Sequence, residues 1–128
     1  MRSLLAAAIL LAANTAFADE LVGFAAFENA DYTTAYPHLM AAAKEGNDEA
    51  MYLLGRMYQY GYGVQENLEE ARSWYQKSAD KNNTMAQLSL GFFYDTQKNY
   101  VEALKWYLKA AEKGNPIAQR NVGLMYAT

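Results

Sequence analysis

The chain of 128 residues contains no cysteine, a single histidine and only two prolines. The absence of cysteine excludes disulfide bonds, thiolate metal sites and a cysteine nucleophile. One histidine without cysteine is also too few for the usual ligand sets of zinc, so we expect no metal and no cofactor. The formal net charge of −3 disfavours general binding to nucleic acid or to anionic membranes. The 52% of hydrophobic residues and the 11 tyrosines predict a folded chain.

The first 18 residues have the pattern of an export signal. Arg2 supplies a positive start, an apolar run follows over residues 4–11, and Ala16-Phe17-Ala18 has the small-x-small spacing after which a signal peptidase cuts. The apolar run is shorter than the roughly 20 residues that a membrane-spanning helix needs, so we expect no membrane insertion. The pattern therefore predicts cleavage after Ala18 and a periplasmic mature chain of residues 19–128. The alternative is a buried N-terminal helix.

Four glycines divide the rest of the chain into repeats. Gly23, Gly55, Gly91 and Gly123 are separated by 32, 36 and 32 residues. Other residues recur with the same offsets: Ala50, Ala86 and Ala118; Tyr58, Tyr94 and Tyr126; Ala35, Ala71 and Ala103; Trp74 and Trp106. Such a period is the signature of stacked helical units that bury their apolar faces against each other. Glycine and alanine let the helix backbones approach, and we expect Tyr58, Trp74, Tyr94 and Trp106 to fill the gaps.

Helix boundaries are marked by a second set of repeated residues. Side chains that cap helix starts precede the periodic runs, and residues suited to left-handed helix ends follow them: Asp31, Asn47, Asn67, Asn83, Asn99 and Asn115, then Gly46, Asn82 and Gly114. The pattern predicts leading helices over 20–29, 48–60, 84–95 and 116–127, and trailing helices over 32–45, 68–81 and 100–113. The expected fold is an all-α, right-handed α–α superhelix, a solenoid of helix hairpins. Its units are residues 19–46, 47–82, 83–114 and a partial unit 115–128.

The residues from Ala50 onward also resemble a known repeat. The motif reads Ala50…Leu54-Gly55…Tyr58…Gly61-Tyr62-Gly63-Val64…Ala71…Trp74…Ala79 and returns in part from Ala86 to Gly114. It is similar to the Sel-one-like repeat, a relative of the tetratricopeptide repeat. The resemblance implies a scaffold for protein–protein contact. Exported relatives imply two alternatives, an immunity protein that neutralises a secreted toxin such as a phospholipase effector, and a β-lactam-binding hydrolase. The relatives of the latter kind carry disulfides, which this chain cannot form.

Catalytic residues are not expected. His38, the only imidazole, occupies the position that Trp74 and Trp106 hold in later repeats, which predicts a half-buried spacer. The carboxylate pairs Asp48/Glu49 and Glu69/Glu70 fall in first helical turns, where negative charge is favourable without any catalytic role. We therefore expect a binding protein and not an enzyme.

The candidate binding residues are positions on the leading helices that the repeat motif does not claim. They differ from unit to unit, as expected where a protein partner sets their identity: Tyr52, Arg56, Gln59, Leu88, Phe92, Asp95, Arg120 and Leu124. We expect them on the concave side of the solenoid, although Leu88 and Phe92 are equally typical of core. Lys77, Lys81, Lys109 and Lys113 form a repeated stripe that faces either an acidic partner or solvent.

The last predicted helix, residues 116–127, has no trailing partner in the sequence. Its apolar residues, among them Val122, Leu124 and Tyr126, are unusual at the end of a solenoid, where a polar cap is typical. Three explanations stay open: the helix caps the stack by itself, it docks on a partner or a second copy, or the chain belongs to a longer array.

Overall fold

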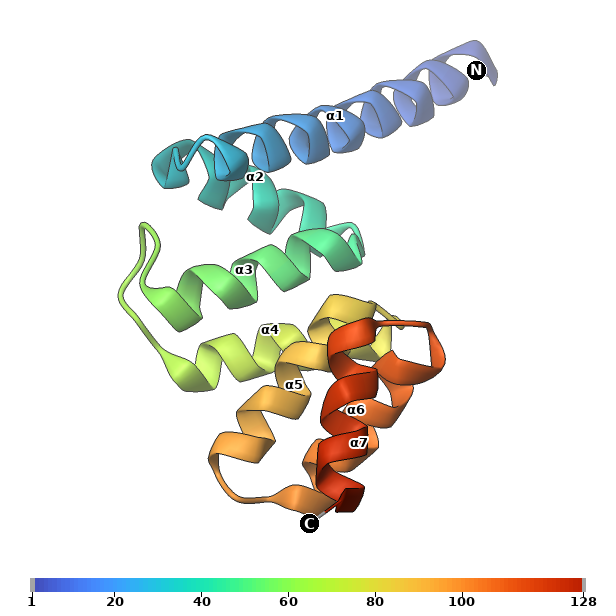
Figure 1. The fold of residues 1–128 in the computed structure, drawn as a ribbon. Helices are drawn as coiled ribbons and strands as arrows, with labels where there is room; N and C mark the ends of the chain where they lie inside the picture. The colour runs from blue at the N-terminus through green and yellow to red at the C-terminus, as the bar shows by residue number, and fades with distance from the viewer. Residues whose placement is uncertain (1, 128) are drawn as a thin grey trace.

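The computed structural model describes residues 2–127, and among residues 2–14 it describes only the side chain of Leu4. Within this range the chain forms seven helices and no strand (Figure 1). The helices are α1 (Arg2–Glu28), α2 (Tyr32–Lys44), α3 (Asp48–Tyr60), α4 (Leu68–Asp80), α5 (Thr84–Thr96), α6 (Tyr100–Glu112) and α7 (Pro116–Ala127). Helix hairpins α1–α2, α3–α4 and α5–α6 are stacked in chain order, and α7 packs on α6. The predicted all-α solenoid of hairpins is confirmed.

Six of the predicted helices begin at the expected residue and end within one residue of it. The first one is wrong at its start, because α1 begins at Arg2 and not at residue 20. The apolar segment and the first leading helix form one continuous helix, since alanine and leucine favour helix and no breaker separates them. In Figure 1 the first part of α1 extends beyond α2, away from the stack. Cleavage after Ala18 stays a prediction.

Each predicted capping residue accepts a hydrogen bond at the start of its helix. The Asn47 side chain accepts from the amide of Ala50 at 2.8 Å, and the other five make the equivalent bond to the amide three residues on. The predicted left-handed ends are also confirmed, with positive φ at Gly46, Asn82 and Gly114. Ala30 and Lys98 adopt the same conformation, which was not predicted because neither residue favours it.

The motif glycines of the second and third hairpins are covered by the tyrosines that directly follow the repeated tryptophans. A Cβ atom placed on Gly55 would lie 2.5 Å from the ring of Tyr75, and one on Gly91 would collide with the ring of Tyr107. Both rings are almost fully buried, with exposures of 1% and 0%. Trp106 is buried in the core, with an exposure of 4%, and Trp74 packs against this core, but neither ring covers a motif glycine. The ring that does so belongs to the next residue in each trailing helix, because that residue faces the leading helix of its own hairpin.

Candidate functional site

Three hollows follow one another along the leading helices in the described part of the chain. The N-terminal hollow lies between α1, α2 and α3 and has a volume of about 520 Å³. The middle hollow, between α3, α4 and α5, measures about 380 Å³. The C-terminal hollow, between α5, α6 and α7, measures about 400 Å³. Because α3 borders the first two hollows and α5 the last two, the hollows form a series along the stack.

The N-terminal hollow combines aromatic rings with charges of both signs. The Arg56 guanidinium lies 5.3 Å from the ring centre of Phe27 and 6.0 Å from that of Tyr52, within the range of a cation–π contact. Glu28 and Glu49 line the same hollow. Burial, more than any neighbouring charge, raises the pKa of Tyr52, so this hydroxyl stays neutral and available as a hydrogen-bond donor.

The middle hollow presents an exposed aromatic ring beside polar groups. Phe92 lines it and is 43% exposed. The Gln59 side chain accepts a hydrogen bond of 2.5 Å from the Tyr75 hydroxyl, which fixes the orientation of the amide. Glu69, at the start of α4, contributes a carboxylate that also lies 3.3 Å from Arg72.

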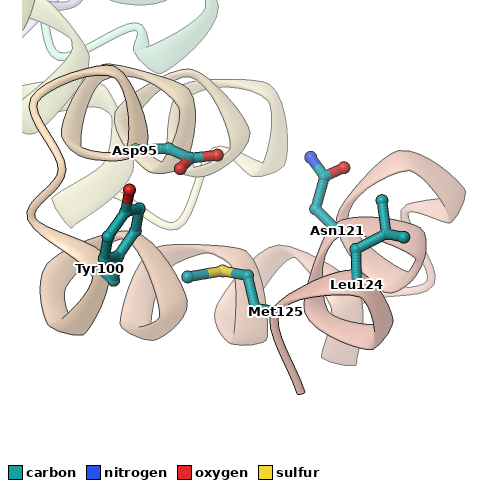
Figure 2. A pocket seen from close by; sticks show the side chains of 5 residues that line it. All are labelled: Asp95, Tyr100, Asn121, Leu124 and Met125. Carbon is teal, nitrogen blue, oxygen red and sulfur yellow. The ribbon is translucent and has the colours of Figure 1, made fainter. Parts of the chain in front are cut away.

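The C-terminal hollow is shown in Figure 2. Asp95 from α5 and Tyr100 from α6 stand on one side of it, and Asn121, Leu124 and Met125 of α7 stand on the other. The Tyr107 hydroxyl donates a hydrogen bond of 3.3 Å to the Asp95 carboxylate. Burial raises the pKa of Tyr107, and the adjacent Asp95 carboxylate raises it further. Tyr107 therefore holds Asp95 as an acceptor at the edge of the hollow.

Six of the eight predicted binding residues line these hollows. Tyr52 and Arg56 lie in the first, Gln59 and Phe92 in the second, and Asp95 and Leu124 in the third. Leu88 is buried in the core beside Ala103 and Tyr107, which is the alternative left open for it. Arg120 is an exposed residue of α7 and is not among the residues that line a hollow.

Sequence reasoning missed several aromatic members of the hollows. The clearest is Phe27, which stands four residues after Gly23 as Gln59 stands after Gly55 and Asp95 after Gly91. Applying the repeat spacing to the degenerate first unit identifies this residue. Phe93 and Tyr100 have no such signal, because they reach the hollows only through the crossing of neighbouring hairpins.

The basic stripe contacts its own chain. The ammonium groups of Lys77 and Lys109 lie 4.4 Å and 4.7 Å from the ring centres of Trp74 and Trp106. The ammonium of Lys113 donates a hydrogen bond to the carbonyl of Asn82 at the end of α4. Lys77, Lys109 and Lys113 therefore already have partners within the chain.

Groups with catalytic potential are dispersed. His38 is half-buried, and its Nδ1 lies 2.8 Å from the carboxylate of Asp19. The Ser78 hydroxyl donates to the backbone carbonyl of Asp48, so it is held in a structural hydrogen bond. Among the described residues, no three His, Asp or Glu side chains are grouped closely enough to hold a metal ion. In the same range no helix is both long and apolar enough to cross a membrane.

Comparison with known proteins places this architecture in a family. The chain is similar to the crystal structure of a Sel1 repeat protein from Oxalobacter formigenes, with 38% identity and a TM-score of 0.79 over 82% of this chain and 45% of that one. It is also similar to c5321, a protective antigen of uropathogenic Escherichia coli, with 34% identity and a TM-score of 0.70 over 74% of this chain and 21% of that one. DAP3-binding cell death enhancer 1 of Rattus norvegicus is 42% identical over 57 residues, which cover 44% of this chain and 11% of that protein.

This chain thus spans less than half the length of each of these relatives. The Sel1 repeat itself matches residues 48–83 and 84–115, more than half of the sequence. Proteins built from this repeat are generally protein-interaction scaffolds and typically lack catalytic activity. With both the repeat motif and the stacked hairpins in agreement, the chain belongs to the Sel1 repeat family.

Proposed function

We propose that this protein is an exported, periplasmic scaffold that binds a segment of another protein along its leading helices. The observation that carries the proposal is the series of three hollows. Helix α3 forms a wall of the first and second hollows, and α5 forms a wall of the second and third. An extended segment laid across these helices meets each hollow in turn. The hollows are preformed by the packing of the hairpins, so binding does not require the scaffold to become ordered.

The exposed rings at the hollows support the proposal. Aromatic and arginine side chains most often anchor protein interfaces, and Phe92 and Arg56 are of these types. Neither residue covers a motif glycine, although the Phe92 ring also meets the Tyr107 ring edge-to-face at 5.6 Å. The relative from Rattus norvegicus carries a binding partner in its name, which fits a family of protein-binding scaffolds.

The decisive experiment is site-specific photocrosslinking in a Gram-negative host. A photoreactive phenylalanine analogue replaces Phe92, and the matched control carries the same analogue at Val101, which is 81% exposed on α6 and lines none of the three hollows. We expect protein adducts at position 92 and few at position 101. Equal crosslinking at both positions would reject a binding surface on the leading helices.

Two further measurements divide the proposal into its parts. The mass of the chain recovered from the periplasm is expected to correspond to a start at Asp19, and recovery only of the uncleaved chain from the cytoplasm would reject export. A single toxin recovered in a one-to-one complex identifies an immunity protein, whereas several different adducts identify a general scaffold. The paired substitution Arg56→Ala with Phe92→Ala is expected to remove the adducts of a chain that carries the analogue at Asn121, while helicity by circular dichroism stays unchanged.

A further inference from the structure

Negatively charged side chains outnumber positively charged ones in the lining of the three hollows. Their described lining contains four carboxylates, Glu28, Glu49, Glu69 and Asp95, and one cation, Arg56. The N-terminal hollow, where two carboxylates outnumber Arg56, and the C-terminal hollow each carry one negative charge in excess, whereas Glu69 of the middle hollow is paired with Arg72 at 3.3 Å. An acidic partner segment would meet repulsion at the two outer hollows, and a cationic one would meet attraction there.

The lysines of the trailing helices do not offset the excess at the N-terminal and C-terminal hollows. Lys77, Lys105 and Lys109 lie over tryptophan rings at 4.4 to 5.3 Å, and none of them is among the residues lining a hollow. These three lysines therefore lie over tryptophan rings of their own helices and do not line the hollows.

The aromatic rings add a second, independent requirement. Phe92 and Tyr100 are 43% and 54% exposed at the middle and C-terminal hollows. A ring face attracts a guanidinium or ammonium group, and the stem of an arginine or lysine packs along apolar surface while its charged end reaches a carboxylate. The N-terminal hollow already contains such a contact within the chain, since the Arg56 guanidinium lies against Phe27.

From these observations we infer that the segment bound along the leading helices is cationic, with arginine or lysine side chains seated between the exposed rings and the carboxylates. This inference rests on the proposed function and specifies the chemistry of its partner. The N-terminal and C-terminal hollows each take one basic side chain, for which the carboxylates supply the charge, and the rings along the surface supply the apolar contact. Because the carboxylates are largely exposed, binding weakens as salt screens them.

The test uses the full chain and two fluorescein-labelled peptides with the same serine and leucine background. One carries arginine at every third position and the other carries glutamate there. Fluorescence anisotropy is expected to show binding of the arginine peptide alone, with at least about tenfold weaker affinity in 500 mM than in 50 mM salt. Equal binding of the glutamate peptide, or no binding of the arginine peptide at millimolar concentration, would overturn the inference.

Matched variants locate the contact. Glu49→Gln combined with Asp95→Asn removes two carboxylates with little change in shape, and the amide at position 95 can still accept from Tyr107. We expect about fivefold to tenfold weaker binding of the arginine peptide, since each exposed pair contributes a modest amount. The control Glu112→Gln removes an exposed carboxylate of α6 outside the hollows and is expected to leave binding unchanged. Equal losses in both variants would show only a general charge effect and would reject the site.

The two proposals fail in different ways. If position 92 crosslinks to a partner whose binding is insensitive to salt and to the double variant, the surface on the leading helices stands and the cationic partner does not. If crosslinking is equal at positions 92 and 101, the surface itself is rejected.

Discussion

Gly91 and Gly123 occupy the same position in successive repeats, yet their surroundings differ completely. A Cβ atom on Gly91 would collide with the ring of Tyr107, whereas one on Gly123 would meet nothing within 4 Å. Both residues lie inside helices, so neither glycine is required by its own backbone conformation. The comparison teaches that the motif glycine is required by the trailing helix that covers it, and that α7 has no such cover in the described chain.

The first hairpin gives an intermediate case. Gly23 is covered by Leu39, whose Cδ2 would lie 3.0 Å from an added Cβ. Leu39 stands where Tyr75 and Tyr107 stand in the later hairpins, and Phe27 stands where Gln59 and Asp95 accept the tyrosine hydroxyls. Leu39 has no hydroxyl group that needs a hydrogen-bond acceptor, so the acceptor position can hold the apolar Phe27. The residue that covers the glycine and the residue at the acceptor position therefore change together from the first hairpin to the later two.

The largest effect is expected for Gly91→Ala. The added methyl group cannot be accommodated without moving the buried Tyr107 ring, and overpacking of this kind costs about 2–3 kcal/mol of unfolding free energy. Urea unfolding followed by circular dichroism measures the loss. Adding Tyr107→Leu places a leucine over position 91, as Leu39 lies over Gly23 in the first hairpin, and is expected to restore part of the lost stability. A Gly91→Ala variant as stable as the parent chain would refute the packing argument.

A smaller effect is expected at alkaline pH. Burial raises the pKa of Tyr75 and Tyr107 well above the usual 10.0, so above pH 10 the unfolded chain releases protons that the folded chain retains. Below pH 10 the stabilisation is fully present. Above it, the unfolding free energy falls by at most about 1.4 kcal/mol per pH unit for each tyrosine.

The comparison for this prediction is Tyr75→Phe, which keeps the ring over Gly55 and removes the titrating group. Its unfolding free energy is expected to be lower by about 1 kcal/mol at neutral pH, because the bond to Gln59 is lost. Between pH 10 and 11 its stability is expected to decline less steeply than that of the parent chain. If the denaturation midpoints of the variant and the parent chain fall equally with pH, Tyr75 is not the group whose titration lowers the stability.

The smallest effect, and the only stabilising one, is expected for Gly123→Ala. Alanine favours helix over glycine by about 0.5–1 kcal/mol, and nothing at this position obstructs the methyl group. Thermal unfolding at low protein concentration measures the gain. The same variant tests the predicted self-association through α7: if a second copy covers Gly123, the substitution is expected to weaken the oligomer in size-exclusion chromatography.

Helix positions were the most predictable part of this protein. Asn47 and Asn83 fix helix starts by local hydrogen bonds to amides three residues on, which need no tertiary information. The start of α1 was not predictable from the same rules, because the apolar run of a signal sequence and the first turns of a helix are both rich in alanine and leucine. Ala30 and Lys98 show the limit at helix ends, since they adopt positive φ although neither residue favours it, while the amides of Asp31 and Asn99 bond back to the carbonyls of Ala26 and Tyr94.

The candidate site was predictable in part. Excluding the motif positions on the leading helices identified Tyr52, Arg56 and four other lining residues, because the period of the helix fixes which positions share a face. The same rule could not separate Leu88, which lies on that face but deep between α5 and α6. To distinguish a buried position from one that lines a hollow, one must know how closely the neighbouring helix packs against it.

The sequence by itself determined the number of helices, their caps and the repeat, since these depend on local hydrogen bonds and on periodicity. The tertiary structure alone decided that Tyr75 and Tyr107 cover the glycines, and that Glu69 and Tyr100 join the hollows. The physical reason is that a helix presents several side chains toward its neighbours. Which of them meets a backbone, a ring or open space depends on the distance and crossing of the next helix, which no single hairpin encodes.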